Sequence, residues 1–505
     1  MTPRRRAQPV WPTGCSARRA RREVTMPGYH LKVKPLELIS AEQVHDIQRA
    51  ALQVLWETGV RIESDWALDF LAGHGCAVDR DEQRVRFPAA LVEECLQKAP
   101  RTFRLRARDP KNDLEFGGNL LHFSHGSGMH TIDPRTFVPR PPTRAEYVDC
   151  VRVLDALPTI SCLGCYPYFG HEGVPPVLAI PTGVALKMQH STKHQTTCYS
   201  QECEIFNIQM AQAAGIEISG AATSSAPLTW SGEAVNCARR MAEAGFAIVT
   251  IDGCIMGGTG PATVPGSVVV SSAEHLAMIV LVQLLKPGHR MIIGHFSVPL
   301  NMATGAPAFG DIGASLNNAI FNQVWRSYGL PCGNGSPSYV AAKTIDFQAG
   351  YEKGMAGLVA ALSGVNHLLL HFAVSAEISA HPVQAVLDDD VASMIGRLIA
   401  GEEVSDETLA VDLIHKIGPI PGHYLNTAHT RKWWKREQVL PRAADRLTYP
   451  EWVAQGKKTA LDLARQRVDE ILAGPPPQPL APGQEEDIER ILVEARAYYR
   501  ERRLL

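Results

Sequence analysis

The sequence has little of what a secreted, membrane-spanning or disulfide-stabilised protein needs. Its 11 cysteines are an odd number scattered through 505 residues, a usage that favours reduced thiols over a disulfide framework. The most apolar segment, residues 276–285, is much shorter than the roughly 20 residues that a membrane span requires. We therefore expect a cytoplasmic protein.

The chain also has almost no excess of one charge sign, since its net charge is −2. Residues 1–25 hold seven Arg and one Glu, so the rest of the chain is near −8. A body of that sign excludes the broad basic surface of nucleic-acid-binding proteins. No apolar run follows the arginines, which excludes a secretory signal. We expect a disordered leader, or Met26 as the true start.

Metal and nucleotide motifs are incomplete. Cys162-Leu163-Gly164-Cys165 has the spacing of half a zinc site or of a redox pair, but no second pair accompanies it. Buried or pocket-lining thiols, and no metal site, are expected instead. Gly257-Gly258-Thr259-Gly260 lacks the Lys-Ser/Thr of a nucleotide loop and the G-x-G-x-x-G pattern. It suits a close backbone approach to a ligand, or a simple tight turn.

The hydrophobic pattern predicts eight short strands, and most of them are followed by a helix. They are residues 120–124, 160–165, 196–200, 217–222, 247–252, 291–295, 330–333 and 367–371. Alternating strands and helices imply parallel pairing, and eight strands imply closure into a TIM-type (β/α)8 barrel over residues 120–387. A doubly wound open sheet is the alternative, because pattern alone does not prove closure.

The remaining segments flank this barrel. Residues 26–119 read as a small N-terminal α+β cap, and residues 388–505 as a helical extension that contains a Pro475-Pro476-Pro477 linker. Helix starts are marked by an N-cap candidate at Ser231 and by three capping boxes that begin at Ser40, Thr143 and Ser271.

Several sequence pieces occur in one recognisable order. They are Gly257–Thr263, Ser271-Ser272-Ala273-Glu274, Gln283–Gly288, Met291–His295, Leu330-Pro331-Cys332-Gly333, Asp346–Lys353 and Leu387-Asp388-Asp389-Asp390. In order and spacing they resemble the trimethylamine methyltransferase family, from about Leu36 onward. Members of that family pass a methyl group from a methylamine or betaine to the cobalt of a corrinoid protein. The resemblance implies a methyltransferase whose corrinoid (cobalamin) is supplied by a partner protein, and it leaves a homo-oligomer open.

One family feature is missing. Some members carry pyrrolysine in the barrel, where it is thought to hold and activate the amine, whereas this chain consists of the twenty standard residues. The resemblance therefore implies a substrate already activated by quaternary charge, such as glycine betaine. Trimethylamine or another methylamine is the alternative.

The resemblance and the predicted topology nominate catalytic residues. Asp346, Gln348 and Glu352 lie where a loop becomes a helix, a place where a barrel puts catalytic groups. Asp346 also suits a helix N-cap, and Glu352 a solvated ion pair. Lys343, Gln348 and His371 are candidate donors for a substrate carboxylate.

A quaternary ammonium is attracted by aromatic faces, which form no competing bond with it. Side chains near strand ends or in the Asp346–Lys353 segment are therefore candidate substrate-binding residues: Tyr166, Tyr168, Tyr199, His295, Phe296, Tyr351 and His371. His125, Gly258 and Gly260 are candidates for loops that face the corrinoid.

Two other function classes remain open. A lyase or aldolase would use Lys343 or Lys193 to form a Schiff base, and a binding protein would hold a betaine without a corrinoid partner.

Deleting residues 1–25 should leave stability and activity unchanged, because dense like charge without apolar periodicity gives the leader nothing to pack with. The measurements are the melting temperature and the turnover of the truncated chain. A fall of more than a few degrees, or loss of turnover, would show that the arginines dock on the acidic body.

Overall fold

Parallel strands form the centre of this computed structural model, which describes residues 27–133 and 135–505. Within those residues the strands are β7 (Leu120–His125), β10 (Cys162–Leu163), β11 (His194–Thr197), β12 (Ile218–Thr223), β14 (Ala247–Ile251), β16 (Met291–His295), β18 (Cys332–Asn334) and β19 (His367–His371). Each predicted strand is confirmed to within a few residues. The prediction for the leader lies outside the described residues.

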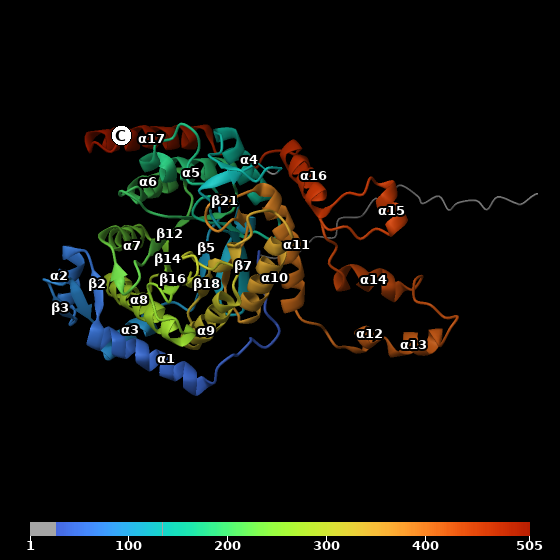
Figure 1. Cartoon of the computed structure of the whole chain (residues 1–505), viewed down its shortest axis with the longest axis horizontal. Helices are drawn as coiled ribbons and strands as arrows, with labels where there is room; N and C mark the ends of the chain where they lie inside the picture. The colour runs from blue at the N-terminus through green and yellow to red at the C-terminus, as the bar shows by residue number, and fades with distance from the viewer. Residues whose placement is uncertain (1–26, 134) are drawn as a thin grey trace, which may run out of the picture.

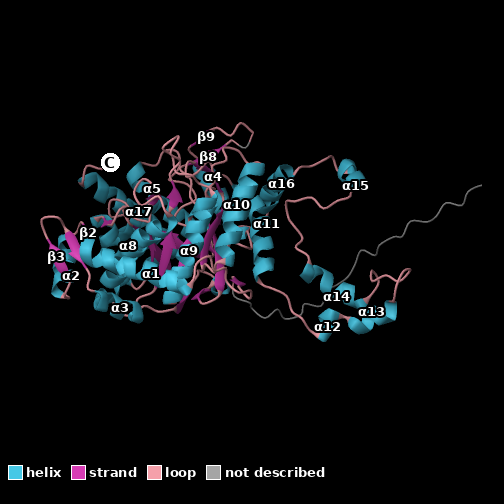
Figure 2. Cartoon of the chain, turned by 60° about the horizontal axis from the view of Figure 1, so that its bottom comes forward, coloured by secondary structure: helices cyan, strands magenta, loops and turns pink. Residues whose placement is uncertain are grey.

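The strands belong to one curled sheet. Its order is β1-β7-β19-β18-β16-β14-β12-β11-β10, where β1 (Tyr29–His30) is an antiparallel edge and the other neighbours are parallel. Phe123 of β7 forms a parallel bridge with Ile160, just before β10, and the Ser161 N–H donates to the Phe123 carbonyl over 2.8 Å. The fold is thus mixed α/β with a curled nine-stranded sheet, surrounded by helices in Figures 1 and 2.

A helix separates each parallel strand from the next. These helices are α4 (Arg144–Ala156), α5 (Pro176–His190), α6 (Glu204–Ala214), α7 (Gly232–Ala244), α8 (Val264–Leu285), α9 (Ile312–Tyr328) and α10 (Phe347–Leu362), and α11 (Pro382–Ile399) follows β19. The capping box at Thr143 and the N-cap at Ser231 are confirmed. The boundary predicted between the barrel and the C-terminal extension, at Leu387 and Asp388, falls inside α11.

The predicted helix start at Ser271 is wrong. Helix α8 begins after Thr263, and Ser271 and Glu274 are buried in its middle. Instead of capping a helix, the Glu274 carboxylate accepts hydrogen bonds from Ser224 Oγ (2.6 Å) and the Leu228 N–H (2.7 Å). The helix also extends well beyond the short apolar run. Among the described residues it is the one helix long and apolar enough to cross a membrane, but 78% of that stretch is buried.

The N-terminal elements cover this apolar helix. They are α1 (Ala41–Gln53), which begins with the predicted capping box at Ser40, then β2 (Val60–Ile62), α2 (Asp65–Gly73), β3 (Ala77–Asp79), β4 (Arg84–Arg86) and α3 (Ala89–Lys98). Helices α1 and α3 both pack against α8.

A hairpin closes the amino end of the sheet. It consists of β5 (Thr102–Leu105) and β6 (Leu114–Gly117). Its Leu105, Leu114 and Phe116 share one apolar cluster with Cys162, Ala247 and Ile292, which lie at or next to the first residues of their strands. The opposite, carboxyl ends of the strands are therefore the end at which loops can present functional groups.

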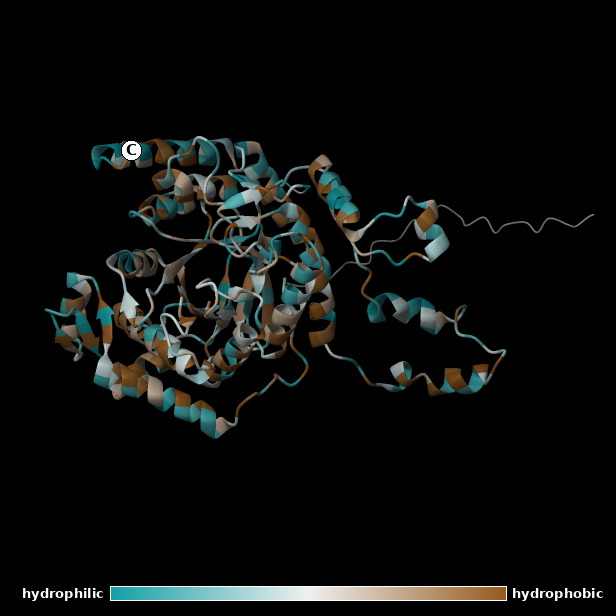
Figure 3. Ribbon diagram, in the orientation of Figure 1, coloured by the Kyte–Doolittle hydropathy of each residue, from teal (hydrophilic) through white to brown (hydrophobic). Residues whose placement is uncertain are grey.

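The C-terminal helices form two groups. α16 (Ala460–Ala473) packs on α4 and α11, and α17 (Pro482–Glu501) packs on α5 and α6. In Figures 1 and 2, α12 (Asp406–Leu409), α13 (Val411–Ile417), α14 (Ala428–Glu437) and α15 (Tyr449–Ala454) project to one side of the main body. In Figure 3, α13 has both brown (hydrophobic) and teal (hydrophilic) parts, and its Val411 and Ile414 are half exposed.

A buried ion pair joins α10 to α11. Lys353 Nζ lies 3.1 Å from Asp388 Oδ2 and donates to the carbonyls of Ser338 and Leu370, each over 2.8 Å. Asp388 also accepts from the Phe372 N–H (2.8 Å) and from Gln384 Nε2 (2.7 Å). Burial raises the pKa of Asp388 and lowers that of Lys353, so desolvation outweighs their mutual attraction.

Replacing Lys353 by Met should lower the free energy of unfolding by about 3–5 kcal/mol, because it leaves a buried carboxylate without its cation. Chemical denaturation measures the loss. The matched control is Lys343→Met, since Lys343 is exposed and, among the described residues, its ammonium donates only to the Ala341 carbonyl. This change should cost less than about 0.5 kcal/mol. Equal denaturation midpoints for the two variants would contradict the argument.

Candidate functional site

A buried lysine shapes the loops at the carboxyl ends of β10 and β11. Lys187, on α5, donates to the carbonyls of Gly164 (2.7 Å), Cys165 (2.7 Å) and Thr196 (2.6 Å). Burial lowers its pKa to about 8. All three of its N–H groups are used, so Lys187 fixes the backbone from which Cys165, Tyr166 and Cys198 extend and has no N–H left for a ligand.

The two cysteines of the C-x-x-C motif lie apart. Cys162 is fully buried, with its sulfur 3.5 Å from His367 Nε2. Cys165 is half-buried, and a hydrogen bond with the Cys198 thiol lowers its pKa. Among the described residues, no group of three or more His, Cys, Asp or Glu has an arrangement that would hold a metal ion. The two cysteines that contact each other are Cys165 and Cys198, which follow the neighbouring strands β10 and β11.

Aromatic rings gather where β16 and β18 end. The Phe296 ring centroid lies 5.2 Å from that of Tyr339 and 5.8 Å from that of Phe309, and Tyr339 and Phe309 are 5.5 Å apart. The Tyr339 hydroxyl accepts a hydrogen bond from the Ser127 N–H (2.9 Å), which ties the loop after β18 to the loop after β7. We call Phe296, Phe309 and Tyr339 the aromatic cluster.

Tyr166 and Glu377 lie close to this cluster. Burial raises the pKa of Tyr166, and the charges of Cys198, Cys165, Tyr339 and Glu377 raise it further. The pKa of Tyr339 is raised mainly by burial and next by Glu377. Tyr166 and Glu377 are therefore near enough to interact electrostatically with the cluster, although they follow different strands.

Glu377 combines exposure with partial desolvation. Its side chain is open to solvent, yet the surrounding protein raises its pKa through desolvation. Within the described structure its carboxylate has no hydrogen-bond or ion-pair partner. A carboxylate that is accessible but walled by protein suits a concave part of the surface.

The loop that carries Glu377 is strained. Phe372 (φ 90°), Ser375 (φ 57°) and Ala376 (φ 58°) are non-glycine residues in the left-handed region, which costs about 1–3 kcal/mol each. The Ser375 and Ala376 N–H groups donate to the carbonyls of Ala342 (2.8 Å) and Val340 (2.7 Å). The loops after β18 and β19 thus hold each other in one conformation.

A buried aspartate positions Phe296. Asp252 Oδ1 accepts from the Phe296 N–H (2.6 Å), and its Oδ2 lies 2.6 Å from His295 Nδ1. His295 Nε2 faces Asn317 Oδ1 at 2.9 Å, and the ring stacks on Phe321. Burial alone would raise the pKa of Asp252, but the attraction of His295 outweighs it and lowers the pKa to about 2. His295 is therefore a fully buried support behind Phe296.

The other two nominated histidines are also buried. His371 Nε2 contacts Thr159 Oγ1 (2.9 Å), which in turn donates to Asp389 of α11, so its ring is directed toward α11. His125 Nε2 accepts from the Gly164 N–H (3.0 Å). Burial lowers the pKa of both to about 3, so both rings are neutral at ordinary pH.

The nominated catalytic cluster supports the loop after β18. Asp346 is the N-cap of α10 and accepts from the N–H groups of Gln348 (2.9 Å) and Ala349 (3.3 Å). Glu352 is buried and accepts from the Ala341 N–H (2.8 Å) and from Gln348 Nε2 (2.7 Å). The N-cap prediction for Asp346 is confirmed. Glu352 anchors the loop that carries Tyr339 and is not a solvated surface charge.

The remaining nominated residues are dispersed. Tyr168 is buried and donates to Thr131 Oγ1 (3.3 Å), Tyr199 donates to the Thr223 carbonyl (3.1 Å), and Tyr351 is half exposed. Gly258 and Gly260 lie in the turn after β15 (Ile255–Met256), where a Cβ on Gly260 would be 2.1 Å from Cys254 Sγ. The tight turn at this segment is thus confirmed.

The two candidate Schiff-base lysines are engaged elsewhere. Lys193 is buried and donates to the carbonyls of Leu154 (3.1 Å) and Leu157 (2.8 Å), just before the amino end of β11. Lys343 donates to the Ala341 carbonyl (2.6 Å). Neither arrangement supports a lyase or aldolase.

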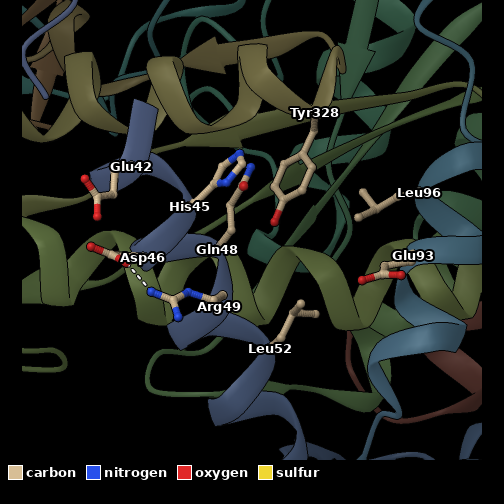
Figure 4. Close-up of a pocket in the computed structure, with 9 residues that line it drawn as sticks. All are labelled: Glu42, His45, Asp46, Gln48, Arg49, Leu52, Glu93, Leu96 and Tyr328. Atoms are coloured by element: carbon tan, nitrogen blue, oxygen red, sulfur yellow. Dashed lines mark hydrogen bonds and ion pairs between the residues drawn. The ribbon is translucent and has the colours of Figure 1, made fainter. Parts of the chain in front are cut away.

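Two hollows of the described structure lie away from the aromatic cluster. One of about 490 Å³ is lined by residues of α1 and α3 and by Tyr328, which ends α9 on the amino-end side of the sheet (Figure 4). The other, about 390 Å³, is lined by Arg108, Asp109 and the segment before α17. Neither hollow includes a residue from the loops at the carboxyl ends of the parallel strands. The candidate site is therefore located by side-chain chemistry and sheet topology, and not by the volume of a hollow.

Several site residues were not nominated from the sequence, among them Lys187, Phe309, Tyr339 and Glu377. Lys187 had a usable signal, because it is the one Asp, Glu, Lys or Arg in the mostly apolar helix α5. Tyr339 and Glu377 had none, since both lie in irregular loops whose fold depends on contacts between the two loops.

Aromatic faces and an unpartnered carboxylate attract small organic cations. They lie at the carboxyl ends of the parallel strands, the end at which α/β folds bind small molecules. Sequence comparison is more specific: the model of the family described as trimethylamine methyltransferase matches residues 12–497. The chain belongs to the trimethylamine methyltransferase family and is a methyltransferase, as its motifs predicted.

Individual relatives agree with this family. The chain is 30% identical over 462 residues to a glycine betaine methyltransferase of Desulfitobacterium hafniense (strain Y51). The aligned residues cover 88% of this chain and 94% of that relative. The chain is 28% identical over 457 residues to trimethylamine methyltransferase MttB of Desulfitobacterium hafniense (strain DSM 10664 / DCB-2), with coverages of 87% and 90%.

Among solved structures, the monomethylamine methyltransferase MtmB of Methanosarcina barkeri is similar in fold. Its TM-score is 0.50 at 12% identity, over 93% of this chain and 90% of that one. A hydroxylamine complex of MtmB gives a TM-score of 0.52 at 13% identity, over 92% and 88%. At such identities the likeness shows the fold alone.

The Asp252–His295 contact should make stability sensitive to acid. Because the pKa of Asp252 is lowered from 3.8 to about 2 on folding, its stabilisation is present above pH 4 and is lost as the pH falls toward 2. The loss should be about 2 kcal/mol. Melting temperatures between pH 5 and pH 2 should fall less steeply for Asp252→Asn than for the wild type. The exposed Asp81→Asn is the control, and an unchanged slope for Asp252→Asn would refute the prediction.

Proposed function

We propose that this methyltransferase takes its methyl group from a quaternary amine and passes it to the Co(I) of a corrinoid carried by a partner protein; the similarity to a glycine betaine methyltransferase makes glycine betaine the first compound to test. The single observation that supports this most is the aromatic cluster with Tyr166 beside it at the carboxyl ends of the strands. A quaternary nitrogen leaves as a neutral amine, so its departure needs no proton donor. Aromatic faces hold such a cation without forming a bond that the reaction must break.

We also propose that the curled sheet is a (β/α)8 barrel. The bridge between Phe123 and Ile160, which joins the two ends of the parallel run, supports closure. The hairpin at the amino end supports a single open end. A barrel would place the loops after all eight strands around one opening.

Each residue group then has a role in the proposed reaction. Phe296, Tyr339 and Tyr166 bind the ammonium group and exclude water from it, since a cation freed of water is more reactive toward a nucleophile. Asp346, Gln348 and Glu352 position the loop that carries Tyr339. Asp252 and His295 position Phe296. The nominated catalytic residues would thus act through the aromatic rings.

The corrinoid would supply a strong nucleophile, Co(I), from the partner protein. The residues that would meet it are those of exposed loops after the strands, among them Gly258 at the turn after β15. Exposed loops at the carboxyl ends could contact a bulky macrocycle on another protein. A cytoplasmic location is part of the proposal, because such a partner and reduced thiols both require a reducing compartment.

The test mixes the full chain with a reduced corrinoid protein and either glycine betaine or trimethylamine, and follows methyl-cobalt formation by absorbance. We expect turnover of the quaternary amine. Turnover of trimethylamine alone would overturn the substrate assignment. Tight betaine binding without partner association or methyl transfer would favour a binding protein.

Phe296 provides a matched pair of variants. Phe296→Leu keeps an apolar side chain but removes the aromatic face, so KM for the quaternary amine should rise about fivefold or more. Phe296→Tyr keeps the face and should stay within about twofold of the wild type. Equal KM values for the two variants would remove Phe296 from the site.

A further inference from the structure

We propose that Glu377 makes this site selective for quaternary ammonium compounds with a net positive charge, such as tetramethylammonium or choline, over zwitterions whose carboxylate lies close to the ammonium. The inference rests on the proposed function, because it assumes that the aromatic cluster binds the ammonium group. Beyond the proposed function, the inference specifies the charge that the rest of the substrate should carry.

Position is the first reason. The Ala376 N–H, next to Glu377, donates to the Val340 carbonyl, next to Tyr339, over 2.7 Å. The Glu377 carbonyl accepts from the Met129 N–H (3.0 Å), two residues from the Ser127 N–H that donates to the Tyr339 hydroxyl. In agreement, the charge of Glu377 raises the pKa of Tyr166 and of Tyr339. A cation held by these rings would therefore lie within reach of the Glu377 carboxylate. Coulomb attraction over several ångströms near a protein surface changes affinity by about tenfold, and a substrate carboxylate at that distance suffers a repulsion of the same size.

Availability is the second reason. The Glu377 carboxylate has no partner among the described residues, so a bound cation would not have to displace one. Its neighbours Met129 and Ile378 are large apolar side chains that are half exposed.

Rigidity is the third reason. Met129 N–H donates to the Glu377 carbonyl (3.0 Å), and the two strained residues before Glu377 are bonded to the loop that carries Tyr339. Backbone strain persists only where the surroundings enforce it, and such sites are concentrated where function requires a fixed geometry. The backbone at Glu377 is therefore held beside the loop that carries Tyr339.

Two donors that a zwitterion could use are already engaged. The three N–H groups of Lys187 point to carbonyls, and His371 is buried with its Nε2 on Thr159. The side chains of Lys343 and Gln348 each donate one hydrogen bond within the described structure and keep further N–H groups, so Glu377 is the group that would disfavour a substrate carboxylate there.

The experiment measures equilibrium dissociation constants by calorimetry for tetramethylammonium, choline and glycine betaine on the full chain. We expect the two net cations to bind at least about tenfold more tightly than glycine betaine. Glu377→Gln should bring this preference to within about threefold, and Glu377→Lys should reverse it. Glu94→Gln, which removes an exposed carboxylate on α3, should leave the preference unchanged.

The outcomes separate this inference from the proposed function. Wild-type protein that binds glycine betaine as tightly as the cations, or a preference that survives in Glu377→Gln, would overturn the role of Glu377. In that case methyl transfer from any quaternary amine would still uphold the proposed function. If none of the three compounds binds, both proposals fail together. The charge-reversed variant guards against a trivial result, because a merely unfolded variant would bind nothing and could not reverse a preference.

Discussion

The contact on which the candidate site most depends is the buried ion pair of Lys353 and Asp388. Through it, α10 and α11 are joined to the backbone at Ser338, Leu370 and Phe372. Those three points lie directly before Tyr339, within β19, and at the strained residue that begins the loop to Glu377. Because desolvation opposes the pair, its value lies in geometry more than in net stability. The neighbouring Asp389 and Asp390 extend the same arrangement: Asp389 binds Thr159, and Asp390 accepts the N–H groups of Arg442, Ala443 and Ala444.

The loops at the carboxyl ends are organised by charged groups that bind backbone atoms. Lys187 binds three carbonyls, Glu352 accepts from the Ala341 N–H, and Asp252 accepts from the Phe296 N–H. These bonds orient the backbone of the loops and do not use the aromatic side chains; the Tyr339 ring is oriented by the hydrogen bond that its hydroxyl accepts from the Ser127 N–H. In the proposed site, these charged residues would position the aromatic rings without touching the ligand.

Sequence reasoning was reliable where periodicity and local motifs decide the structure. The strands, the capping boxes at Ser40 and Thr143, and the family motifs all depend on short segments and were predicted correctly. It failed at Ser271 because a Ser-x-x-Glu pattern does not reveal whether it begins a helix or lies inside one. It also missed Tyr339 and Glu377. Their positions result from hydrogen bonds between the loop after β18 and the loop after β19, which are separated in the sequence by helix α10. His295 and His371 were located correctly on their strands, but which way each ring faces depends on Asp252 and Thr159, which no local pattern connects to them.

The apolar helix α8 has a consequence for how the chain is made. Its outer face is covered by α1 and α3, which are synthesised more than 160 residues earlier. During translation these two helices therefore leave the ribosome with an apolar surface that has no counterpart until α8 emerges. When α8 does emerge, it is itself long and hydrophobic enough to be mistaken for a membrane segment. The N-terminal elements are thus already made when α8 emerges and can cover it at once. A chain that lacked them would leave the apolar surface of this helix exposed and prone to aggregation.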